Sequence, residues 1–87
     1  MNADEAKEAV RNSLRAANER FGAGDPKAHN SVGRALESLV EYHDLRNTAG
    51  RPDEFAHRAF LDEVTAGLVR VARPLSSALF RFHSFIE

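Results

Sequence analysis

Cysteine is absent from this 87-residue chain, and glycine and proline are scarce. Without cysteine the chain forms neither a disulfide nor a thiolate metal site, which suits a reducing compartment. The 12 basic and 13 acidic residues nearly cancel, so no bulk charge draws the chain to nucleic acid or to an anionic membrane. No apolar run is long enough to cross a bilayer, and the polar residues 1–12 do not have the form of a secretory signal. We therefore expect a cytoplasmic protein.

The chain is long enough for a single domain, residues 1–87, with a small core. A chain of this size buries about 60–65% of the surface that its unfolded form exposes. A second copy would let the same helices bury more apolar area, at ~25 cal/mol per Å². We therefore expect a homodimer.

Apolar residues recur every three to four positions in three successive stretches, which predicts an all-α fold. The first predicted helix spans residues 3–21 and begins with Asn2 and Glu5, which have the spacing of a capping box. The second spans residues 26–47, and the third runs from about residue 53 to residue 72. The chain is thus predicted to form a small antiparallel helical bundle of three to four helices.

Proline and glycine mark the ends of these predicted helices. Asp25 and Pro26 suit the N-cap and the first position of the second helix. Pro74 cannot donate a helical hydrogen bond, so the last helix is kinked there or restarts over residues 75–86. Gly33 lies inside the second helix, where it predicts a close-packing position.

Each predicted helix places its core residues on one face at about 100° per residue. The predicted core residues are Ala3, Ala6, Val10, Ser13, Leu14, Ala17 and Phe21 in the first helix, Ala28, Val32, Ala35, Leu36, Leu39, Tyr42 and His43 in the second, and His57, Phe60, Leu61, Val64, Gly67, Leu68 and Val71 in the third.

The C-terminal segment is rich in large apolar residues, namely Leu79, Phe80, Phe82, Phe85 and Ile86. An intramolecular core accounts for most of them, but Phe80 lies about 140° around the helix from the centre of the apolar stripe. One reading is a single exposed aromatic residue, and the other is a surface for a protein partner. We predict that these five residues bind a partner, most simply a second copy, and that the protein is a non-enzymatic binding or regulatory module.

A polar cluster of His43, Arg46 and His57 interrupts the apolar faces of the second and third helices. Antiparallel helices would bring the three side chains to the same end of the bundle. Histidine and arginine in this setting suit phosphate binding or acid–base chemistry. The structural alternative, which we favour, is a histidine bonded to a carbonyl or a carboxylate such as that of Asp53.

Two arginines near His57 suggest an enzymatic alternative. The segment RPDEFAH places five residues between Arg51 and His57, and Arg46-Asn47 supplies an Arg-Asn pair. This arrangement resembles the HEPN class of small helical ribonucleases, which carry an arginine and a histidine at such a spacing and act as homodimers. The resemblance implies metal-independent RNA cleavage in which Arg46 or Arg51 stabilises phosphate charge and His57 transfers protons. RNA is the only nucleic acid that we consider as a partner.

Metal and cofactor sites are not predicted. Glu54 and His57 have the Glu-x-x-His spacing of di-iron bundles, but the carboxylates of the second helix point outward in the predicted arrangement. The chain has no phosphate-binding glycine loop and no serine or cysteine nucleophile motif. Arginine outnumbers lysine ten to two, but codon usage in a G+C-rich genome accounts for this ratio without phosphate recognition.

Overall fold

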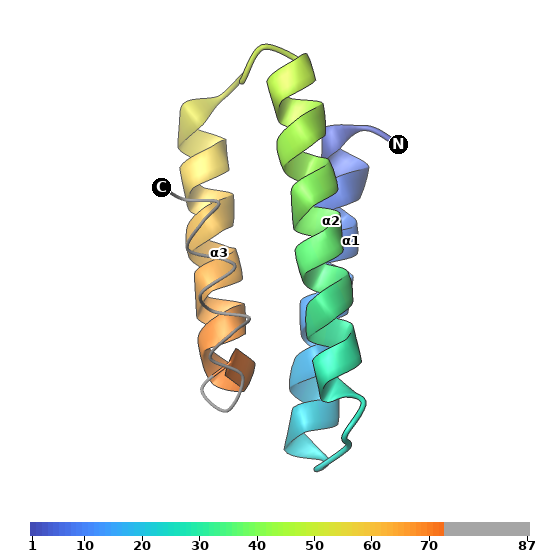
Figure 1. Cartoon of the computed structure of the whole chain (residues 1–87). Coiled ribbons are helices and arrows are strands. Elements are labelled where there is room, and N and C mark those ends of the chain that lie inside the picture. Colours follow the sequence, from blue (N-terminus) through green and yellow to red (C-terminus); the bar gives the residue numbers. More distant parts are fainter. Residues whose placement is uncertain (73–87) are drawn as a thin grey trace.

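A computed structural model of the chain contains three α-helices joined by two short connections (Figure 1). The structure describes residues 1–72, and the predicted restart at Pro74 and the segment 75–86 lie outside this range. The helices are α1 (Ala3–Gly22), α2 (Ala28–Thr48) and α3 (Glu54–Ala72). They include 83% of the described residues, and no strand occurs among these residues. The all-α prediction is therefore confirmed.

The first helix begins with the predicted capping box. The backbone N–H of Glu5 donates to Oδ1 of Asn2 at 2.9 Å, and the backbone N–H of Asn2 donates to Oε1 of Glu5 at 3.3 Å. Each side chain thus satisfies a backbone donor that has no partner within the helix.

The second helix begins two residues later than predicted, at Ala28 instead of Pro26. Asp25 still caps the chain locally, because its Oδ1 accepts from the N–H of Lys27 at 2.9 Å and its carbonyl accepts from the N–H of Ala28 at 3.1 Å. These bonds form a tight turn in front of α2, so Lys27 takes the N-cap position without a side-chain hydrogen bond.

The connection from α2 to α3 contains three residues with positive φ angles, Gly50 at 87°, Arg51 at 56° and Asp53 at 49°. The N–H of Arg51 donates to the carbonyl of Arg46 at 2.9 Å, which closes α2 in the manner of a Schellman motif with Gly50 in the left-handed position. Asp53 then starts α3, because its Oδ1 accepts from the N–H of Ala56 at 3.0 Å. The left-handed backbone of Arg51 and Asp53 is strained for residues with a side chain.

The three helices share one hydrophobic core, and most of the predicted core positions belong to it. Its members are Ala6, Val10, Leu14, Ala17, Val32, Ala35, Leu36, Leu39, Tyr42, Phe60, Val64, Leu68 and Val71. The prediction was wrong for Phe21, which is 44% exposed. Phe21 lies in the last turn of α1, where the chain leaves the helix pair, so too little of α2 remains alongside to cover it.

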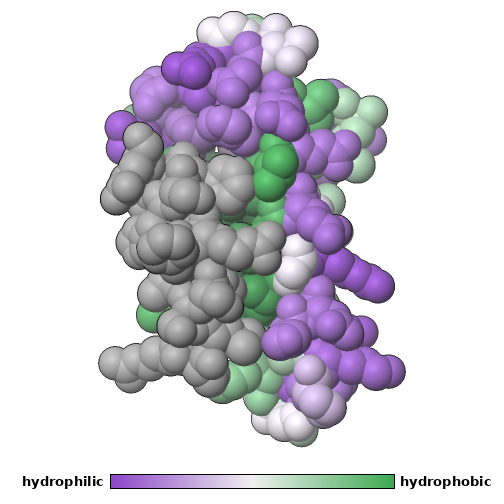
Figure 2. All heavy atoms as spheres, in the orientation of Figure 1, coloured by the Kyte–Doolittle hydropathy of each residue, from purple (hydrophilic) through white to green (hydrophobic). Residues whose placement is uncertain are grey.

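Successive helices run in opposite directions in Figure 1, and α1 and α2 make the closest pair. Small buried side chains such as Ala6, Ala17 and Ala35 allow this close approach. The third helix contacts α1 more than α2. On the face drawn in Figure 2, hydrophilic residues cover the right-hand side of the molecule, and a strip of apolar residues runs beside them. None of the described helices is both long and apolar enough to span a membrane.

The close-packing glycine is Gly67 on α3, whereas Gly33 does not have the role predicted for it. A Cβ atom at Gly67 would lie 3.2 Å from Cδ1 of Leu14 on α1, whereas a Cβ atom at Gly33 would meet no atom within 4 Å. Gly67 thus brings α3 against α1.

We expect a substitution by leucine to have opposite effects on stability at Gly67 and at Gly33. Gly67→Leu should lower the free energy of unfolding by ~1–3 kcal/mol, because the new side chain overpacks the contact with Leu14. Gly33→Leu is the matched control and should raise the free energy of unfolding by up to ~1 kcal/mol through helix propensity. Urea unfolding followed by circular dichroism measures both changes. Equal effects at the two positions would contradict the packing role of Gly67.

Candidate functional site

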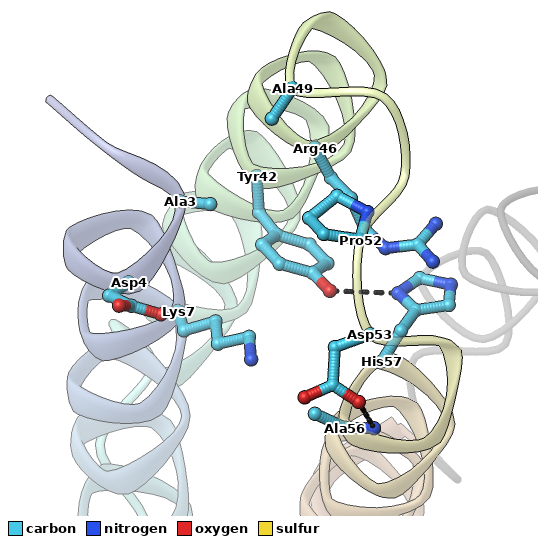
Figure 3. A pocket seen from close by; sticks show the side chains of 10 residues that line it. All are labelled: Ala3, Asp4, Lys7, Tyr42, Arg46, Ala49, Pro52, Asp53, Ala56 and His57. Atoms are coloured by element: carbon cyan, nitrogen blue, oxygen red, sulfur yellow. Dashed lines mark hydrogen bonds between the residues drawn. The ribbon is translucent and has the colours of Figure 1, made fainter.

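Tyr42 and His57 are joined by a hydrogen bond where α2 leads into α3 (Figure 3). The tyrosine hydroxyl and Nδ1 of His57 lie 2.7 Å apart, and the two rings are stacked with centroids 5.8 Å apart. The other side of Tyr42 packs edge to face against Phe60, with centroids 4.8 Å apart. Tyr42 therefore connects the polar end of the structure to its core.

Burial keeps both partners of this bond neutral. It raises the pKa of the Tyr42 hydroxyl above its ordinary value of 10.0. Burial, with a further contribution from the positive charge of Arg46, lowers the pKa of His57 below 6.5. The bond thus joins a phenol to an uncharged imidazole at neutral pH.

Arg46 is the buried charge of this site, with only 7% of its surface exposed. Its Nη2 donates to Oε2 of Glu54 at 2.9 Å and to the carbonyl of Arg51 at 3.4 Å. Arg58 approaches the other oxygen of Glu54, with its Nε donating at 3.2 Å. Hydrogen bonds from Arg58 and Arg46 lower the pKa of Glu54 below 4.5. The buried Nε of Arg46 has no hydrogen-bond partner among residues 1–72.

The predicted polar cluster is thus brought to one end of the structure, with a different set of partners. His43 is half-buried on α2. The proposed partner of His57 was wrong, because Asp53 caps α3 and the hydroxyl of Tyr42 takes its place. The exposed Arg51 donates from its Nε to Oδ1 of Asn47 at 2.9 Å, at the end of α2.

Tyr42 is the residue of this site that sequence reasoning missed. The helical period placed it correctly on the core face of α2 but gave it no polar role. A buried tyrosine hydroxyl usually finds a hydrogen-bond partner, so the signal was a tyrosine inside an otherwise apolar face. His57 faces it from the first turns of α3.

A pocket of about 160 Å³ opens beside Tyr42 and His57. Alanine and proline side chains and the Tyr42 ring form much of its wall, and Lys7, Asp4 and Asp53 add charges of both signs. The Nζ of Lys7 lies 5.7 Å from the centroid of the Tyr42 ring, in a cation–π contact. Pockets for drug-sized ligands measure about 300–1,000 Å³, so this pocket suits only a small group.

The described part of the chain contains no group of three or more metal-ligating side chains. The residues Leu79, Phe80, Phe82, Phe85 and Ile86, which were predicted to bind a partner, lie outside it. Comparisons with protein-family models, with curated proteins and with solved structures found no match to this chain.

The lowered pKa of His57 predicts how stability depends on pH. The unfolded chain takes up a proton at this histidine at a higher pH than the folded chain does. The free energy of unfolding should therefore be greatest above the unfolded pKa of 6.5 and should decrease as the pH falls below it. Urea midpoints measured between about pH 5 and 8 would show this slope.

The slope should become smaller in His57→Gln, which removes the titrating ring. His29→Gln is the matched control, because His29 is an exposed histidine on α2. If His57→Gln retains the full slope, other groups cause the pH dependence.

Proposed function

We propose that this protein is a small non-enzymatic binding or regulatory module that acts as a homodimer through an apolar helical surface. The observation that supports this proposal is a row of exposed side chains along α3. We call it the outer stripe of α3, and it consists of Phe55, Ala59, Asp62, Ala66 and Val69. Phe55 is 86% exposed and Val69 is 51% exposed.

The spacing of the outer stripe is that of a helix–helix contact. Its members alternate four and three residues apart, as the a and d positions of a heptad do. The stripe lies opposite the core face of α3, which carries Phe60, Val64 and Leu68. Four of the five positions of the outer stripe are apolar and Asp62 lies at its centre, so the stripe offers a second helix an apolar surface with one charge in its middle.

The terminal segment is the second part of the proposed surface. We propose that residues 75–86 form a helix that restarts after Pro74 and completes an antiparallel bundle of three to four helices. The few contacts between α2 and α3 support this arrangement, because a further helix beside both would bury more apolar area. Leu79, Phe82, Phe85 and Ile86 share one face of such a helix, and Phe80 extends towards the second copy.

We expect the wild-type protein to be a dimer at tens of micromolar, as measured by light scattering. Phe55→Glu and Phe80→Glu should each shift it towards the monomer, because a charge at the interface must be desolvated without a partner. Val40→Glu is the matched control, since it places the same charge at an exposed apolar residue of α2 outside the outer stripe.

A monomeric wild-type protein would remove the homodimer from the proposal. Weaker dimerisation in Phe55→Glu but not in Phe80→Glu would restrict the interface to the outer stripe of α3. Weaker dimerisation in Phe80→Glu but not in Phe55→Glu would restrict it to the terminal segment. Loss of helical circular dichroism in Phe80→Glu would instead place Phe80 in the intramolecular core.

The alternative function is a metal-independent ribonuclease that uses Arg46 or Arg51 with His57. The observation in its favour is that Arg46 and His57 line the same pocket. Against it, the guanidinium of Arg46 is buried and bonded to Glu54, and Nδ1 of His57 is bonded to Tyr42. We therefore favour a structural role for both residues.

We expect no cleavage of single-stranded RNA by the wild-type protein without added metal. His57→Ala should lower the free energy of unfolding by ~1–3 kcal/mol, because it removes the bond to Tyr42 and leaves poorer packing. His29→Ala serves as the control for stability. Wild-type cleavage that disappears in a stably folded His57→Ala variant would support the ribonuclease instead.

A further inference from the structure

A second pocket, of about 200 Å³, lies between α1 and α2 towards the end where α1 leads into α2. Its wall consists of polar and small residues, namely Asn12, Ser13, Ala16, Arg20, Ser31 and Arg34. Two of these side chains are cationic, and none is a carboxylate. The pocket therefore differs from the one beside His57, where charges of both signs meet.

Arg20 is held at this pocket by a buried hydroxyl group. Its Nη1 donates to Oγ of Ser31 on α2 at 2.9 Å, and Ser31 is only 3% exposed. This bond fixes the position of a long side chain that would otherwise sample many rotamers. The guanidinium thus stays at the pocket, and its other N–H groups remain as donors.

Arg34 lies one turn after Ser31 on α2 and is exposed. The ion pairs of the described residues link Arg11, Arg46 and Arg58 to glutamates, and none of them includes Arg20 or Arg34. Two positive charges from different helices therefore line one pocket, and neither forms an ion pair with a carboxylate of residues 1–72. Their mutual repulsion is relieved when an anion binds between them.

We propose that this pocket binds a phosphate group, either as free inorganic phosphate or as the phosphoryl group of a monoester. Arg20 and Arg34 supply guanidinium donors for charge-assisted hydrogen bonds to its oxygens. The hydroxyl of Ser13 and the amide of Asn12 line the same space and supply neutral donors. This proposal does not depend on the binding function proposed above.

The chemistry and the size of the pocket both favour phosphate. A phosphate dianion has four oxygens and two charges, so it uses two cations and several neutral donors together, which a single carboxylate does not. A volume of about 200 Å³ exceeds the ~30 Å³ that one water molecule takes up in the liquid, so the pocket has space for a compact anion. It is smaller than the ~300 Å³ at which sites for drug-sized ligands begin.

The test is a titration of the ¹⁵N-labelled full chain with inorganic phosphate, monitored by the backbone amide resonances. Sodium chloride at equal ionic strength shows the effect of salt alone. We expect saturable shifts at residues 12–20 and 31–34 with phosphate but not with chloride. Arg20→Gln and Arg34→Gln should each raise the dissociation constant about tenfold or more, because each removes a charge-assisted hydrogen bond.

Arg70→Gln is the matched control, since it removes the same charge from an exposed position on α3. It should leave phosphate binding within about twofold of the wild type, because distant surface charges are screened by salt. Circular dichroism of each variant verifies that the helices are retained. The proposal is overturned if phosphate and chloride give the same shifts, or if Arg70→Gln weakens binding as much as Arg34→Gln does.

A second titration distinguishes the two sources of the phosphate group. It uses a short peptide that contains phosphoserine, with the unphosphorylated peptide as the control. Tighter binding of the phosphopeptide than of inorganic phosphate would support a phosphorylated ligand. Equal or weaker binding would support free phosphate. Binding of both peptides with equal affinity, together with no binding of inorganic phosphate, would refute recognition of the phosphate group.

Discussion

The close packing of α1 against α2 is the constraint on which the rest of this structure depends. Buried alanines such as Ala6, Ala17 and Ala35 let the two helices approach closely, but each contributes little hydrophobic free energy. Larger residues supply that energy where α3 joins the pair, above all Phe60 and Leu68. The third helix packs mainly against α1, and few contacts join it to α2.

Side-chain bonds at the polar end of the structure hold α3 against α2. The core alone holds these two helices together weakly, because few contacts join them. Tyr42 reaches His57 across the two helices, and Arg46 reaches Glu54. A buried guanidinium without its carboxylate would be costly, so the pair holds the start of α3 in place. His57 and Arg46 are both engaged in these bonds, and the proposed function therefore relies on apolar surfaces instead.

The arginines at the two ends of the molecule have different kinds of partner. Near His57, the charge of Arg46 is neutralised by a glutamate. At the pocket between α1 and α2, Arg20 is bonded to the neutral hydroxyl of Ser31 and Arg34 has no carboxylate partner within residues 1–72. An ion pair stabilises the fold at one end, whereas Arg20 and Arg34 form no ion pair with the described residues and leave positive charge at the other end.

Three helices, their capping and stop signals and most of the core can be predicted from the sequence alone, because helical period and end signals are local properties of the chain. The sequence also predicted that Arg46 and His57 would meet, since the short connection constrains both helices. It is the packing of the helices that brings Tyr42 to His57, packs Gly67 and not Gly33 tightly, and places Arg20 and Arg34 at one pocket. These outcomes depend on how far apart the helices lie and how each is rotated about its axis. Both quantities result from side-chain packing across the whole core, which periodicity along one helix does not specify.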